Sequence, residues 1–132
     1  MSRRKLREQI FKLLFRIEFN EIQEMQEQVE LFFLSEDNAT DEESETYIIN
    51  KYRKIVEKKE ELDELINTYA ECWTADRMGK VELSILRLAI YEILYDDDVP
   101  KIVAINEAVE LSKKYGQDDA QKFVNGILAN FA

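Results

Sequence analysis

Hydrophobic residues recur every three or four positions along nearly the whole chain, which is the period of an amphipathic α-helix. In a first helix, expected over residues 3–19, the apolar stripe consists of Leu6, Ile10, Leu13, Leu14 and Ile17. Stripes of the same spacing predict further helices over about 21–34, 41–59, 60–73, 80–95, 102–115 and 119–131. The pattern therefore predicts an all-α protein of about seven helices.

Residues that stop helices are few, with three glycines and one proline in 132 residues. The acidic turn 96–98 and Pro100 are expected to end the fifth helix. Gly116 stands after the sixth helix in the position of a C′ glycine. Asp118 or Asp119 is expected to cap the last helix. The length fits one compact domain with a real hydrophobic core.

Composition excludes several kinds of chemistry. The chain has no histidine, which rules out Ser-His-Asp and Cys-His catalytic groups and histidine-bearing metal sites. A single cysteine, Cys72, rules out an internal disulfide and a cysteine-only zinc site. Acidic pairs such as Glu42 and Glu43 are best explained as solvated helix starts and turns. We therefore expect no catalytic residues, no metal and no cofactor.

No apolar run approaches the roughly 18–20 residues that span a bilayer. The segment from Leu6 to Phe15 is interrupted by charged and polar residues, unlike the apolar stretch of a signal peptide. The sequence therefore predicts no membrane contact and a cytoplasmic protein.

Charge is divided unevenly along the chain. The first sixteen residues hold six basic residues and one acidic residue, a net charge of +5. Because the whole chain carries −10, the remaining residues carry −15. Residues 18–45 hold eleven acidic residues and no basic one, and Ser35–Ser44 is expected to be an exposed acidic loop. This division predicts that a polyanion binds at the N-terminus.

The first helix also carries aromatic residues away from its apolar stripe. At about 100° per residue, Arg4, Arg7, Phe11 and Phe15 share an arc of about 80°. Guanidinium groups bind phosphate and aromatic rings stack on unpaired bases, which is what single-stranded RNA requires. The alternative is that both rings pack against a neighbouring helix and the basic residues form a solvated tail. The sequence of this helix alone leaves both interpretations open.

Several sequence motifs point to one protein family. They are Leu86–Ile93 (LRLAIYEI), Val99-Pro100, Val103–Leu111 (VAINEAVEL), Tyr115-Gly116 and Lys122–Leu128 (KFVNGIL), together with Arg3–Glu8 and Leu14-Phe15 near the N-terminus. These segments closely resemble the NusB transcription antitermination family. The resemblance covers both ends of the chain strongly, and residues 20–75 only by length and helical character.

The resemblance implies a fold of two small helical bundles packed together, with subdomains of about 1–75 and 76–132. It implies a factor that binds boxA-type single-stranded RNA together with NusE, a small-subunit ribosomal protein. In the family this pair loads antitermination complexes on RNA polymerase, notably during transcription of ribosomal RNA operons. The sequence leaves open whether the chain forms a homodimer.

The resemblance also indicates which residues bind. It implies RNA contacts at Arg3, Arg4, Lys5, Arg7 and Phe15 and, in the C-terminal part, at Asp119, Lys122 and Phe123. Glu82 matches a family position close to the RNA and NusE surfaces. Two positions depart from the family. Phe15 stands where tyrosine is usual, so a phenolic hydrogen bond is lost, and Ala120 stands where serine is usual.

Two other functions compete with this interpretation. A similar helical domain forms the N-terminal part of a class of ribosomal RNA cytosine methyltransferases, so the chain could be a related stand-alone accessory module. A methyltransferase would need an α/β domain with a glycine-rich cofactor loop, and this sequence has no such motif. We therefore expect that the chain is not an enzyme. A homodimerising helical protein without an RNA role is the third alternative.

Overall fold

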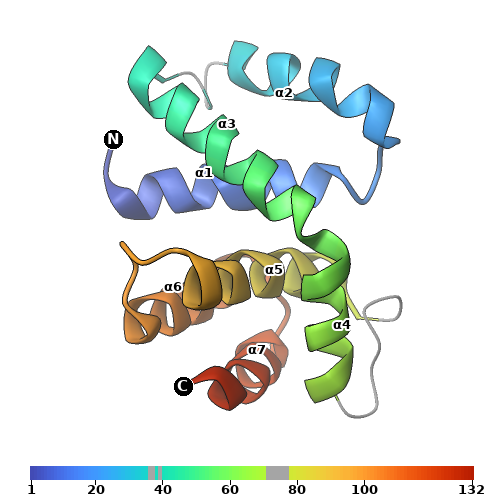
Figure 1. Ribbon diagram of the computed structural model, residues 1–132, viewed down its shortest axis with the longest axis vertical. Helices are drawn as coiled ribbons and strands as arrows, with labels where there is room; N and C mark the ends of the chain where they lie inside the picture. The colour runs from blue at the N-terminus through green and yellow to red at the C-terminus, as the bar shows by residue number, and fades with distance from the viewer. Residues whose placement is uncertain (36–37, 39, 71–77) are drawn as a thin grey trace. The chain divides into compact units, whose positions relative to one another are not determined.

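The structure is a computed structural model that describes residues 1–35, 38, 40–70 and 78–132. These residues form seven α-helices and two short 3₁₀ helices, and they contain no strand (Figure 1). The elements are α1 (Arg3–Arg16), η1 (Ile22–Glu24), α2 (Met25–Leu34), α3 (Glu42–Glu57), α4 (Lys59–Tyr69), α5 (Lys80–Tyr95), α6 (Lys101–Tyr115), α7 (Ala120–Leu128) and η2 (Ala129–Phe131). The predicted all-α class with about seven helices is confirmed. Within the described ranges no helix is both long and apolar enough to cross a membrane.

The chain divides into two compact units, Met1–Val56 and Glu57–Ala132. The first unit holds α1 to α3 and the second holds α4 to α7. Helix α4 therefore groups with the C-terminal helices, whereas the sequence placed the boundary near residue 75. The side chains of α4 account for this grouping, because the Tyr69 ring lies 5.2 Å from the Phe131 ring near the C-terminus. Cys72 and Trp73, expected at the end of the fourth helix, lie outside the described residues.

In the first unit, α1 is capped at its start and joined to α2 at its end. The Ser2 hydroxyl accepts a hydrogen bond from the Lys5 backbone N–H at 3.1 Å, which satisfies one of the N–H groups that the first helical turn leaves open. At the other end, Arg16 Nη1 donates to Gln28 Oε1 at 3.0 Å, and the guanidinium lies 5.2 Å from the centre of the Phe32 ring. One side chain thus fixes α2 against α1 through a hydrogen bond and a cation–π contact.

The start of the second helix and the end of the expected acidic loop differ from the sequence prediction, whereas α3 starts where it was predicted. The second helix begins as the 3₁₀ segment η1, which Glu21 and Glu24 close with a reciprocal capping box. The expected acidic loop Ser35–Ser44 ends earlier, because Asp41 caps α3 by accepting a hydrogen bond from the Ser44 N–H at 3.2 Å. Hydrogen bonds from the Ser44 hydroxyl and backbone lower the pKa of the Asp41 carboxyl. Glu36, Asp37 and Ala39 lie outside the described residues.

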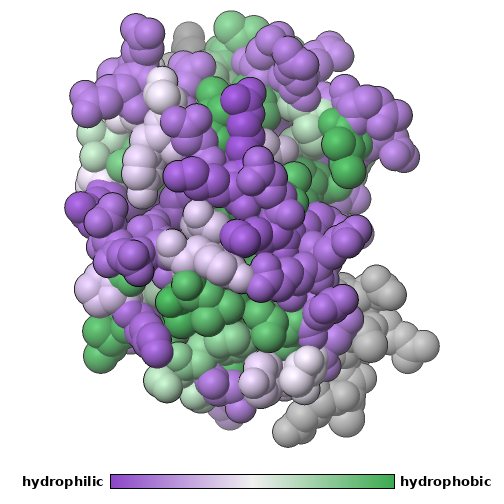
Figure 2. Space-filling model, viewed as in Figure 1, coloured by the Kyte–Doolittle hydropathy of each residue, from purple (hydrophilic) through white to green (hydrophobic). Residues whose placement is uncertain are grey.

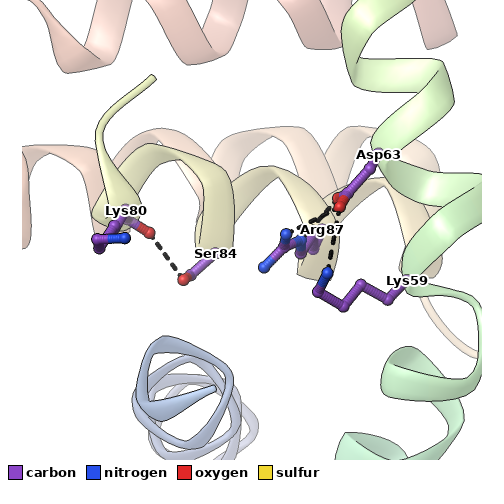
Figure 3. A network of polar contacts seen from close by, with 5 residues as sticks. All are labelled: Lys59, Asp63, Lys80, Ser84 and Arg87. Atoms are coloured by element: carbon purple, nitrogen blue, oxygen red, sulfur yellow. Dashed lines mark hydrogen bonds and ion pairs between the residues drawn. The ribbon is translucent and has the colours of Figure 1, made fainter. Parts of the chain in front are cut away.

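Helix α5 is the centre of the second unit and packs against α4, α6 and α7. Ten consecutive residues, Leu83–Glu92, are buried, so the polar side chains among them need partners inside the protein. Ser84 Oγ donates to the Lys80 carbonyl oxygen at 2.8 Å. Arg87 donates from Nε and Nη2 to the two carboxylate oxygens of Asp63 at 2.7 and 2.9 Å, and Lys59 Nζ lies 3.6 Å from the same carboxylate (Figure 3).

The turn between α6 and α7 depends on a glycine for a reason that the sequence did not predict. Gly116 has an extended backbone, φ −89° and ψ 173°, rather than the left-handed one expected of a C′ glycine. A Cβ at this position would lie 2.5 Å from Ala120 Cβ and 2.8 Å from the Ser112 carbonyl oxygen. The glycine is therefore required because α6 and α7 approach too closely to admit a side chain.

We predict that Asp63→Ala lowers the free energy of unfolding by about 3 kcal/mol, because it removes the bidentate acceptor of a buried guanidinium. Lys59→Ala is the control. It removes the more exposed partner of the same carboxylate and is expected to cost less than about 1 kcal/mol. Urea unfolding followed by circular dichroism measures both. Equal losses for the two variants would contradict the importance of the Arg87 pair.

We predict opposite effects for alanine at two glycines of the second unit. Gly116→Ala is expected to destabilise the protein by about 1–3 kcal/mol, because the new Cβ overlaps Ala120 and the Ser112 carbonyl. Gly126 lies in α7 with no atom within 4 Å of its would-be Cβ. Gly126→Ala is therefore expected to stabilise by about 0.5–1 kcal/mol through helix propensity. A thermal unfolding curve that moves in the same direction for both would refute this explanation.

Candidate nucleic-acid interface

The first turn of α1 presents a cationic surface. Arg3, Arg4 and Lys5 are exposed, and no acidic residue lies in this turn. Cations at a helix N-terminus are unfavourable for the helix dipole, so the dipole gives no reason for three basic residues here. Backbone N–H groups at a helix start and nearby cationic side chains both attract anions. The turn therefore has the chemistry of a phosphate-binding surface.

The other basic residues of α1 are buried or bond to neighbouring side chains. Arg7, which the sequence placed on the RNA-binding arc, is only 7% exposed. Glu8 is buried to the same degree and forms ion pairs with Lys5 at 3.6 Å and Lys12 at 3.9 Å. Of the predicted basic contacts, the structure thus brings Arg3, Arg4 and Lys5 to the surface and places Arg7 largely beneath it.

Three aromatic rings follow one another along α1 and the turn after it. Phe11 is buried at 3% exposure, Phe15 is half-buried and Phe19 is 60% exposed. The ring centres of Phe11 and Phe15 lie 6.3 Å apart, and those of Phe15 and Phe19 lie 5.0 Å apart in an edge-on arrangement. Packing in the core therefore accounts for the Phe11 ring, whereas part of the Phe15 ring remains exposed to a ligand. Sequence reasoning missed Phe19, although its spacing of four residues from Phe15 could have identified it.

In the second unit, a groove of about 780 Å³ lies between the start of α5 and the start of α7. It is lined by Met78, Gly79, Glu82, Gln117, Asp118, Asp119, Ala120 and Phe123. Three of the residues predicted as binding sites, Glu82, Asp119 and Phe123, therefore share one groove. Lys122 is exposed on α7 beside Phe123 but does not line it.

Small residues shape the two walls of this groove. Gly79 precedes α5 as its N-cap residue, and a Cβ there would overlap the Glu82 carboxylate. On the other wall, Ala120 is buried and its Cβ faces Gly116. The alanine that replaces the family's usual serine is thus part of the close α6–α7 turn.

Asp119, one of the acidic residues of the groove, does not cap the helix that it precedes. Asp119 occupies the N-cap position of α7, but its side chain makes no capping hydrogen bond. The expectation that Asp118 or Asp119 caps this helix was therefore right about the position and wrong about the bond. Among the described residues, no group of three or more histidine, cysteine, aspartate or glutamate side chains is arranged to hold a metal ion.

The second unit also exposes apolar side chains outside the groove. Figure 2 shows an apolar area over the helices of this unit on the face turned to the viewer, whereas the side chains over α3 are mostly hydrophilic. At the end of α5 and the start of α6, Leu94, Ile102 and Val103 are 44%, 69% and 39% exposed.

Comparisons with known proteins agree on one family. The sequence model of the NusB family matches residues 4–132. A relative from Agathobacter rectalis named Transcription antitermination protein NusB is 52% identical over 132 residues, which is 100% of both chains. T. maritima NusB has a TM-score of 0.84 at 36% identity and covers 100% of this chain and 91% of its own. A chain from a complex of antitermination factors NusB and NusE with double-stranded RNA has a TM-score of 0.77 at 29% identity, covering 99% of this chain and 97% of its own.

The helix order and these matches define an all-helical protein of the transcription antitermination class. The chain belongs to the NusB family. The resemblance predicted from the motifs is thereby confirmed. The expectation that the chain is not an enzyme is confirmed by the same finding, because the family is one of transcription antitermination factors.

Proposed function

We propose that the chain binds boxA-type single-stranded RNA together with NusE and so acts as the RNA-loading subunit of an antitermination complex on RNA polymerase. The observation that carries this proposal is the exposed cationic first turn of α1 on a chain of net charge −10. Phosphate contacts dominate the affinity of proteins for nucleic acids, and this turn supplies them. The proposal extends to ribosomal RNA operons and to a cytoplasmic location, where RNA polymerase acts.

We assign the RNA contacts by exposure and chemistry. Arg3, Arg4 and Lys5 bind phosphates, and the half-buried Phe15 ring stacks on a base. Arg7 contributes less to phosphate binding than these residues, because only 7% of its surface is exposed. In the second unit, Asp119, Lys122 and Phe123 form a further set of contacts around the groove.

The acidic character of the rest of the chain supports a basic protein partner. A body charge of −15 repels RNA and attracts a ribosomal protein, which speeds encounter and selects the partner. The solved NusB–NusE complex with RNA is consistent with this pairing. We assign Glu82 to the side of the groove that NusE approaches. A homodimer remains an alternative state of the free chain.

The proposal is tested by titrating a labelled boxA-type RNA with the protein alone and with its cognate NusE, at two salt concentrations. We expect tight binding only when NusE is present, and a dissociation constant that rises steeply with salt. Because the related complex contains double-stranded RNA, a duplex of the same sequence is titrated in parallel. Absence of RNA binding under every condition would refute the proposal.

The same titration locates the phosphate contacts. Arg4→Ala is expected to reduce the slope of log K against log salt by about 0.7, the value for one phosphate of a single strand. Lys113→Ala removes an exposed cation of α6 that pairs with Glu110 at 3.3 Å, and it serves as the control with an unchanged slope.

We predict that Phe15→Ala weakens RNA binding by about 1–3 kcal/mol, the usual contribution of one base–aromatic stack. Phe15→Tyr keeps the stacking surface and is expected to bind at least as well as the native chain. Because the ring also contacts Phe11 and Phe19, urea unfolding is measured on the same variants. A loss of stability without any change in the dissociation constant of the folded protein would show that the ring is only structural.

A further inference from the structure

Helix α2 has an exposed side that carries large apolar residues. Leu31 and Leu34 are 46% and 77% exposed, and Ile22 in the preceding η1 is 82% exposed. No other large apolar side chain among the described residues is as exposed as Ile22 and Leu34. Figure 2 shows apolar side chains at the surface of the first unit over α2, between hydrophilic ones. Exposed apolar residues gathered among polar ones are typical of a protein-binding surface.

Two glutamates share this side of the helix with the leucines. At about 100° per residue, a single arc of about 100° holds Glu27, Glu30, Leu31 and Leu34. Both glutamates are exposed. We call these four residues the outer face of α2. It combines apolar and negatively charged groups on adjacent helical turns.

The opposite side of α2 is fixed within the first unit. Met25 and Phe32 are buried, and Arg16 donates to Gln28 and lies over the Phe32 ring. Arg16 is therefore engaged on the packed side of the helix and does not neutralise the outer face. Because the helix is already held in place, a partner that binds the outer face pays little to order it.

The charge of this part of the chain selects the kind of partner. Residues 18–45 hold eleven acidic residues and no basic one. Phosphates of RNA and of lipid headgroups are repelled by such a segment, and the α2 helix of a second copy would bring like charges together. A basic amphipathic helix matches both properties of the outer face. Its apolar stripe packs on the leucines, and lysine or arginine beside that stripe pairs with the glutamates.

We infer that the outer face of α2 binds a basic amphipathic helix of a further protein component of the antitermination complex. This inference rests on the proposed function, which places the chain in that complex. The outer face belongs to the first unit, whereas Glu82, which we assigned to NusE, belongs to the second. We therefore expect this component to be a protein other than NusE.

The chemistry of the outer face is tested with a synthetic helical peptide that carries leucines every three or four positions and lysines on both sides of them. The peptide is titrated into the isotope-labelled full chain, and backbone amide signals are followed by NMR. We expect saturable shifts for residues 27–34. A scrambled peptide of the same composition is expected to leave these signals in place, because it has the charge without the apolar stripe.

Two double variants separate the apolar from the charged contribution. Leu31→Ser with Leu34→Ser is expected to weaken peptide binding about tenfold or more, because a buried leucine contributes that much to affinity. Glu27→Gln with Glu30→Gln is expected to weaken it about threefold and to flatten its salt dependence. All four side chains are exposed, so the fold is expected to survive, and urea unfolding verifies this.

Matched control variants lie in the second unit. Ile102→Ser removes an apolar side chain that is 69% exposed on α6, and Glu60→Gln removes an exposed carboxylate of α4. Both are expected to bind the peptide like the native chain. Equal binding of the scrambled peptide, or peptide shifts that lie outside α2, would overturn the inference.

The role of the outer face in the complex is tested by transcription through a terminator in a cell extract depleted of the native chain. The Leu31→Ser, Leu34→Ser variant is expected to lower readthrough at least threefold, while its affinity for RNA with NusE present stays unchanged. Unchanged readthrough would overturn the inference. So would a variant that weakens NusE binding, or one that abolishes a dimer seen by sedimentation, because the face would then belong to NusE or to a second copy. If the variant has no effect and the native chain still binds RNA with NusE, only this inference fails and the proposed function stands.

Discussion

Burial of α5 is the constraint on which the second unit depends. A helix with ten consecutive buried residues can be apolar on every side, yet this one carries Arg87 in the middle. A buried guanidinium costs several kcal/mol unless a partner matches its charge and its planar geometry. Asp63 supplies both, from a different helix. The pair therefore specifies which helix lies beside α5 as well as contributing to stability, and it explains why α4 belongs to this unit.

Helices α4, α6 and α7 all pack against α5 and complete the core of this unit. The starts of α5 and α7 are not needed for that core, and a groove lies between them. The groove there is shaped by the absence of side chains, because Gly79 leaves room for Glu82 and Gly116 lets Ala120 close on α6. Rigid helices thus carry the acidic and aromatic groups, which is the arrangement that precise recognition requires.

Helical periodicity predicted the elements of this fold because a 3.6-residue stripe is a local property of the chain. Which helix each stripe packs against is not local, so the membership of α4 was missed and the Arg87–Asp63 pair was not foreseen. The candidate site was predicted in part. Position on a helical wheel identified the arc that holds Arg4 and Phe15, but it could not show that Arg7 and Phe11 on the same arc are buried. The groove itself needed the tertiary structure, since its residues come from two separate segments.

Charge separates the two kinds of partner proposed for this chain. The exposed first turn of α1 is cationic, and contacts to phosphate give affinity without sequence information. The residues that follow α1 carry a net charge of −15, which repels RNA and favours a basic protein partner. Because one short cationic turn must hold RNA against this repulsion, a basic partner that neutralises part of the negative charge raises the affinity of the pair for RNA above that of the chain alone.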